Sequence, residues 1–170
     1  MTSRRWAAAL AAVALLGLAG CGEAELTGTR GKDIKTLPVT TVPKVLNGLS
    51  VKPEKVTKAL EQAKQSYVNS VGFYSLRKDN VVQGTIQVSE FGPSARLSDP
   101  EFRTQIINQS SPGTPSNVNV NGTGVQQSTG TKSTVSIWFS EDRFVVLTVL
   151  KSYLGARGLL EQTVVALPGT

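Results

Sequence analysis

Histidine is absent from the 170-residue sequence, and cysteine occurs once, as Cys21. The missing imidazole removes the commonest general base, the commonest zinc ligand and the usual partner of a nucleophilic serine. One cysteine cannot form an intramolecular disulfide, but a domain of about 120 residues buries enough surface to fold without one. The residue types that remain allow carboxylate-dependent hydrolysis, Ser–Lys catalysis and calcium binding through oxygen ligands.

Charged residues are also missing from one long segment, between Thr104 and Thr131. This segment is rich in Ser, Thr, Asn, Gln, Gly and Pro, a composition that does not build a hydrophobic core by itself. We predict a mobile loop followed by a weak strand over residues 117–127. Asn121-Gly122, between short alternating segments, is a hairpin signal.

The N-terminus has the pattern of an export signal. Arg4 and Arg5 precede a short apolar run from Trp6 to Leu18, and small residues lead to Cys21. The run is too short to span a bilayer comfortably. Removal of Arg4 and Arg5 with the signal lowers the formal net charge from +6 to about +4. Ser3-Arg4-Arg5-Trp6 leaves two export routes open, the general secretory route and the twin-arginine route.

The string Leu18-Ala19-Gly20-Cys21 resembles the lipobox of bacterial lipoproteins. The resemblance implies cleavage before Cys21, a diacylglycerol on its thiol and permanent attachment to the extracytoplasmic face of the cell membrane. We therefore expect a signal peptide over residues 1–20, a lipidated N-terminus and flexible tether over 21–50, and a single α+β domain over 51–170. Apolar residues between Leu37 and Leu49 leave open whether the end of the tether docks on the domain.

Hydrophobic periodicity predicts an α+β fold. We expect an antiparallel sheet of about five strands with three helices, largely on one face, in the order α-ββ-α-βββ-α. The helices are expected over residues 53–67, 98–109 and 156–167, and the strands over 72–77, 82–91, 117–127, 134–139 and 144–150. Residues 144–150 are apolar on both sides, which favours a central strand covered on both faces.

Two sets of side chains are candidates for ligand contact. Thr85, Gln87 and Ser89 form a polar row that alternates with apolar residues, as on a sheet face that is open to water. Such a row can bind a sugar or a peptide, but it is also the usual composition of a solvated sheet. Trp138 is either packed or exposed as a contact residue, and packing is the favoured interpretation.

The sequence offers little support for catalysis or metal binding. Most acidic residues lie in predicted turns or helix caps, and Glu90 alone lies at a strand end. The adjacent Glu141-Asp142 pair lacks the spaced oxygen ligands of a calcium loop. Lys132-Ser133 lies in a predicted loop, outside any Ser–Lys motif. We expect neither a metal nor a cofactor.

Several segments resemble those of uncharacterised actinobacterial secreted lipoproteins. They are Phe73-Tyr74-Ser75-Leu76-Arg77, Gln87-Val88-Ser89-Glu90-Phe91, Asp99-Pro100-Glu101-Phe102-Arg103, Gly130-Thr131 and Ile137-Trp138-Phe139. The element order is also similar to that of PsbP-like lipoprotein domains, which implies an antiparallel sheet flanked by helices. Neither resemblance implies a catalytic residue.

These observations favour a monomeric, non-catalytic binding or accessory module of the cell envelope. Its expected partners are the membrane, through Cys21, and an envelope protein or wall polymer. Nucleic acid is not expected as a partner, because no basic stripe alternates with aromatic residues. The alternative is a carboxylate-dependent hydrolase that acts on a wall carbohydrate through Glu90.

Overall fold

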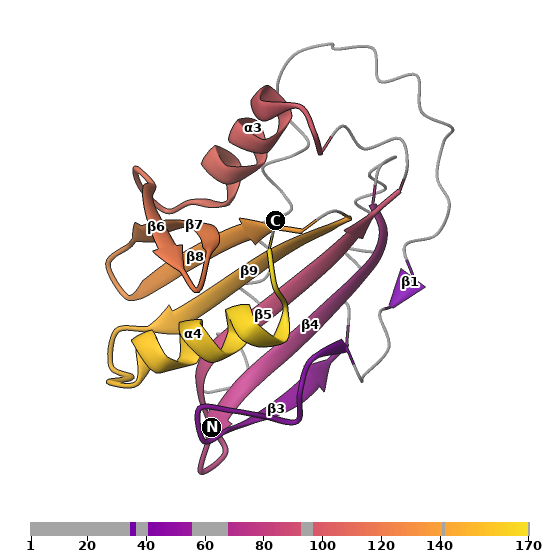
Figure 1. Cartoon of the computed structure of the whole chain (residues 1–170). Coiled ribbons are helices and arrows are strands. Elements are labelled where there is room, and N and C mark those ends of the chain that lie inside the picture. The colour runs from indigo at the N-terminus through magenta and orange to yellow at the C-terminus, as the bar shows by residue number, and fades with distance from the viewer. Residues whose placement is uncertain (1–34, 37–40, 56–67, 93–96, 141, 170) are drawn as a thin grey trace.

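The computed structural model describes residues 35–36, 41–55, 68–92, 97–140 and 142–169 (Figure 1). The expected signal peptide, Cys21 and most of the predicted helix over 53–67 lie outside these residues. Neither described helix has the length and apolar character needed to cross a bilayer.

The described residues form one large sheet and two helices. The sheet has the order β2-β3-β4-β5-β9-β8-β7-β6 and is antiparallel throughout, and the short β1 pairs with β4 in parallel. The elements are β1 (Lys35–Thr36), β2 (Val45–Leu46), β3 (Leu49–Glu54), β4 (Val68–Lys78), β5 (Val81–Phe91), α3 (Pro100–Ser110), β6 (Ser116–Val120), β7 (Thr123–Thr129), β8 (Ser133–Phe139), β9 (Arg143–Leu150) and α4 (Ala156–Ala166).

The expected count of about five strands and three helices is therefore wrong, because the protein is mostly sheet. Pro53, which the sequence placed at the start of a helix, lies in β3 opposite Tyr74 of β4. β2 pairs only with Leu49 and Ser50, so no other strand of the described residues lies beside Pro53 on that side of β3, and proline is tolerated at such an edge position.

The expectation that the helices lie largely on one face is also wrong. α4 lies across one face of the sheet (Figure 1), where Leu159, Leu160 and Val164 join a core that we call the α4-face core. Ile106 of α3 belongs to a second core, the α3-face core, together with Phe91 and other residues. Sequence patterning did not distinguish the two faces, because both helices have similar lengths and one apolar side.

The prediction that residues 144–150 form a central strand is confirmed. β9 lies between β5 and β8, with Val145 and Leu147 in the α4-face core and Phe144 and Val146 in the α3-face core. The neighbouring strand β8 alternates in the same way.

The end of the predicted tether docks on the domain. Val42, Leu46 and Leu49 have exposed fractions of 3%, 3% and 1% and belong to the α4-face core. Asn47 connects β2 to the start of α4, since its Nδ2 donates to Tyr153 Oη at 3.0 Å and to the carbonyl oxygen of Gly155 at 2.9 Å. α4 thus contacts both β2 and β6, the two ends of the sheet order, so the sheet curves around it.

The uncharged segment forms the end of α3, a connection without regular structure over residues 111–115, and then β6 and β7. The predicted loop is therefore short, and the single strand predicted over 117–127 is a hairpin of two strands. The hairpin signal is confirmed, because Asn121 and Gly122 form the two-residue turn between Val120 and Thr123, with φ angles of 51° and 86°. The turn supplies the backbone conformation that joins the two strands, and Val120 and Val125 hold the hairpin to the α4-face core.

Candidate binding groove

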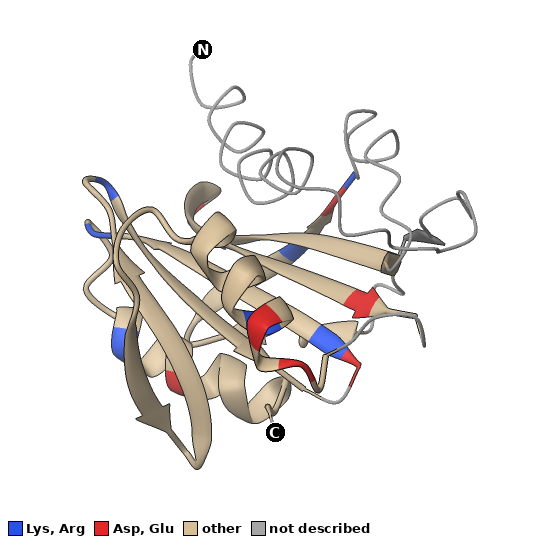
Figure 2. Cartoon of the chain, turned by 90° about the horizontal axis from the view of Figure 1, so that it is seen from above, with Lys and Arg blue, Asp and Glu red and all other residues tan. Residues whose placement is uncertain are grey.

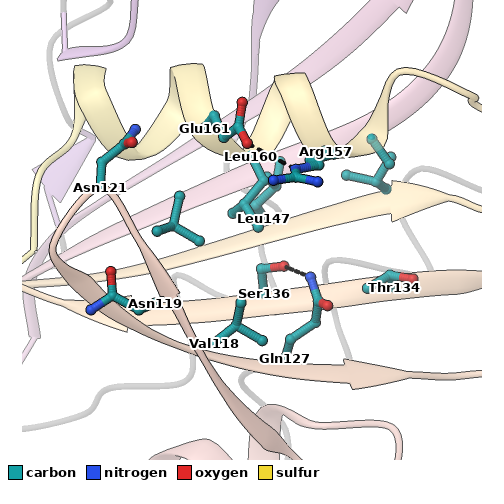
Figure 3. A pocket seen from close by; sticks show the side chains of 13 residues that line it. Val118, Asn119, Asn121, Gln127, Thr134, Ser136, Leu147, Arg157, Leu160 and Glu161 are labelled. Carbon is teal, nitrogen blue, oxygen red and sulfur yellow. Dashed lines mark hydrogen bonds and ion pairs between the residues drawn. The ribbon is translucent and has the colours of Figure 1, made fainter.

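A groove of about 520 Å³ lies between α4 and the β6–β7 hairpin (Figure 3). β8 and β9 pass beneath it. Its volume lies within the range of small-molecule sites, which is about 300 to 1,000 Å³. The curvature of the sheet creates the groove, because it brings the β6–β7 hairpin up to α4.

The floor of the groove is apolar and rigid. Leu147 and Val149 of β9, Leu160 of α4 and Val120 of β6 line it, and all four belong to the α4-face core. A floor built from packed core residues keeps its shape when no ligand is present.

Amide and hydroxyl groups line the walls. Gln127 of β7 and Ser136 of β8 lie opposite each other on neighbouring strands, and Gln127 Nε2 donates to Ser136 Oγ at 3.1 Å (Figure 3). Thr134 lies further along the same strand as Ser136. Asn119 Oδ1 accepts from the backbone N–H of Gly122 at 3.1 Å, which fixes that side chain near the turn. The Gln127 amide has a second N–H and a carbonyl oxygen in addition to this bond. The walls can therefore both donate to and accept from a neutral ligand.

The charges at the groove compensate each other. Arg157 and Glu161 lie one turn apart on α4 and form an ion pair at 3.0 Å. The Arg157 side chain is 93% exposed, so the pair stays in contact with water. The β6–β7 hairpin contributes no charge to the opposite wall (Figure 2). The lining thus favours neither an anionic nor a cationic ligand.

The expected polar row lies elsewhere. Thr85, Gln87 and Ser89 are in β5 and point to the α3 face, on the opposite side of the sheet from the groove. Gln87 and Ser89 are buried, with exposed fractions of 5% and 2%, and Gln87 Nε2 donates to Ser89 Oγ at 3.2 Å. The expectation of a water-exposed row is wrong at these two positions, because β5 is a central strand with a core on each face. Thr85 is half-buried.

Trp138 is packed, as the sequence favoured. Its exposed fraction is 1%, and Nε1 donates to the carbonyl oxygen of Leu167 at 2.7 Å. This bond satisfies one of the carbonyl groups that the end of α4 leaves without a helical partner. Trp138 therefore secures the C-terminal end of α4 from inside the core.

Glu90 is held in a polar cluster at one end of the sheet. Its carboxylate accepts from Ser70 Oγ at 2.7 Å and from Nε and Nη2 of Arg143 at 3.2 and 3.0 Å. Nearby, burial raises the pKa of Tyr74 above its ordinary value of 10.0, and the negative charge of Glu90 raises it further. A glycosidase needs two facing carboxylates with distinct roles, whereas this carboxylate is engaged by a guanidinium group.

A second hollow of about 300 Å³ borders this cluster and is lined by Asp142, Arg143 and Val145, among others. Arg143 Nε also lies 3.9 Å from Asp142 Oδ1, so two carboxylates share one guanidinium group. Among the described residues, no group of acidic side chains is arranged to hold a metal ion.

The groove was not predicted from the sequence. Its walls come from two segments about 30 residues apart in the chain, and only the curvature of the sheet brings them together. The one available signal was the uncharged segment, which supplies Val118, Asn119, Val120, Asn121 and Gln127 of the lining. Comparison with known proteins finds no matching family model, no similar curated protein and no similar solved structure.

Proposed function

We propose that this chain is a lipid-anchored, extracytoplasmic protein that serves as a non-catalytic binding module of the cell envelope, with the groove as its ligand site. The anchor rests on the lipobox at Cys21. The binding role rests on the groove, the larger of the two hollows described above. Two acyl chains on one cysteine bind a membrane far more tightly than one chain does.

The observation that carries the binding role is the combination of an apolar floor with uncharged hydrogen-bonding walls. Such a lining matches a ligand with one apolar side and one side of hydroxyl or amide groups. An uncharged stretch of an envelope protein or of a wall polymer has this chemistry. The absence of histidine and of a second cysteine from the sequence agrees with a role without catalysis.

A tryptophan at Ala156 should block the groove. Ala156 is half-buried at the start of α4 and lines the groove, so an indole at this position fills space that a ligand would occupy. We expect Ala156→Trp to reduce retention of the protein on its cell-envelope fraction at least tenfold, measured by co-sedimentation after the lipid has been extracted with detergent, so that the proposed anchor does not hold the protein there.

The matched control is Leu154→Trp. Leu154 is 99% exposed and is not part of the groove lining. Leu154→Trp therefore introduces the same indole two residues from Ala156 but outside the groove. Both variants should show the circular dichroism spectrum and thermal midpoint of the original protein. Equal retention of all three proteins would refute the groove as the ligand site.

A further inference from the structure

β6 is an edge strand, because it is the last strand in the sheet order. β7 is its pairing partner among the described residues, in a register that sets Val120 opposite Thr123 and Val118 opposite Val125. In a hairpin with a two-residue turn, the residues that flank the turn exchange both backbone hydrogen bonds, and such pairs recur at every second position. The N–H and C=O groups of Val120, Val118 and Ser116 therefore point toward β7.

By the same alternation, the N–H and C=O groups of Asn117 and Asn119 point away from β7, toward the free edge. Each residue presents one donor and one acceptor there. The side chains of β6 are exposed from Ser116 to Asn119, and Val118 has an exposed fraction of 36%.

Natural sheets protect such an edge with lysine, proline, a bulge or a very short strand. β6 has five residues, Ser-Asn-Val-Asn-Val, and its register with β7 is unbroken. At the other end of the sheet order, β2 has only two residues and follows Lys44. Of these two ends, β6 is the one that lacks protection.

We infer that β6 is a self-association edge, on which β6 of a second copy pairs antiparallel about a two-fold axis at Val118. This register sets Asn117 opposite Asn119 of the second copy and Asn119 opposite Asn117 of the second copy. Each pair exchanges two backbone hydrogen bonds, so the edge groups of both strands are satisfied.

Neighbouring registers are poorer. Centring the axis on Asn117 sets Asn119 opposite Pro115, which has no N–H. Centring it on Asn119 sets Asn117 opposite Asn121, whose backbone is committed to the turn. The sequence of the edge thus selects one self-complementary alignment.

The composition of the edge also favours a second copy. No residue from 104 to 131 is charged, so pairing of two β6 strands sets no like charges opposite each other on these strands (Figure 2). Val118 meets its own equivalent in the pair without hydrogen bonds, where side chains come closest. This inference goes beyond the proposed function, because pairing at β6 needs neither a ligand nor the anchor, and it replaces the expectation of a monomer.

Proline at position 117 tests the pairing. Asn117→Pro removes an outward N–H without removing a bond to β7, and proline is tolerated at such edge positions. Asn117→Ala, the matched control, keeps the N–H. In sedimentation equilibrium of the purified full chain, we expect the original protein and Asn117→Ala to approach twice the monomer mass with rising concentration. Asn117→Pro should weaken association at least tenfold.

A monomer at all concentrations would overturn the inference, as would an undiminished dimer in Asn117→Pro. Growth into larger assemblies would also overturn it, since it would indicate pairing of unlike edges that does not close.

A cysteine at position 118 tests the register. The Cα atoms of directly opposed residues without mutual hydrogen bonds are about 4.5 Å apart, within the range that a disulfide accepts. We expect Val118→Cys to form covalent dimers under mild oxidation. Val81→Cys, at an exposed position on another strand, should yield no more dimer than the original chain, which controls for Cys21. Equal yields from the two variants would refute the register.

Discussion

At the scale of single residues, Glu90 shows how a candidate catalytic group can serve structure. Its carboxylate joins β4 to β9 by accepting from Ser70 and from two nitrogen atoms of Arg143. The Glu90 and Arg143 side chains are 27% and 39% exposed, so the pair is neither fully buried nor fully solvated. The sequence identified Glu90 by its place at a strand end but could not show this guanidinium partner.

Replacing Glu90 should therefore cost stability. Glu90→Gln keeps the size of the side chain but removes its charge, which weakens the bonds to Arg143. We expect a loss of about 1 to 2 kcal/mol in the free energy of unfolding, between the values typical of exposed and buried pairs. Urea denaturation followed by fluorescence measures this loss.

The control is Glu161→Gln, which breaks the exposed pair with Arg157 and should cost less than about 0.5 kcal/mol. If the original protein hydrolyses a wall carbohydrate and Glu90→Gln abolishes that turnover with the fold intact, the non-catalytic role is contradicted.

At the scale of elements, segments with a clear hydrophobic period were predicted correctly, and segments without one were not. The helix predicted over 156–167 is α4, Ala156–Ala166, and the predicted hairpin strands 72–77 and 82–91 lie within β4 and β5. Lys78-Asp79-Asn80 contains the predicted turn, and Asp79 and Asn80 have positive φ angles.

The misses have a physical cause. β2 and the first two residues of β3, Leu49 and Ser50, were assigned to the tether. Segments this short show no hydrophobic period, and their order comes from contact with the core. Pro53 favours both the first turn of a helix and an edge strand, and only the neighbouring strand decides between the two. The burial of Gln87 and Ser89 could not be predicted either, because an alternating pattern of polar and apolar residues does not show whether the polar face of the strand is covered by a second core.

Asn47 should be important for the attachment of β2 to α4. It combines a φ of 48°, which asparagine tolerates better than most residues, with the two hydrogen bonds to Tyr153 and Gly155. We expect Asn47→Ala to lower the free energy of unfolding by about 2 kcal/mol, measured by thermal or urea denaturation.

Asn47→Gly separates the two contributions, because glycine accepts the positive φ but makes no side-chain bond. It should lose less than Asn47→Ala. A larger loss in the glycine variant would contradict the role assigned to the backbone conformation.

At the scale of the whole molecule, one helix determines the shape of the sheet and hence the groove. α4 contacts both β2 and β6, so the sheet curves around it and the β6–β7 hairpin forms the opposite wall of the groove. Segments far apart in the chain meet there, which explains why the sequence did not predict the groove. The proposed ligand surface and the proposed self-association edge share β6.

The intact mass of the mature polypeptide, extracted from the membranes of the cells that produce it, tests the lipid anchor most directly. We predict a chain that begins at Cys21 and carries the added mass of a diacylglycerol group on that residue. A chain that retains residues 1–20, or one that begins at Cys21 with a free thiol, would contradict the anchor and the envelope location proposed with it.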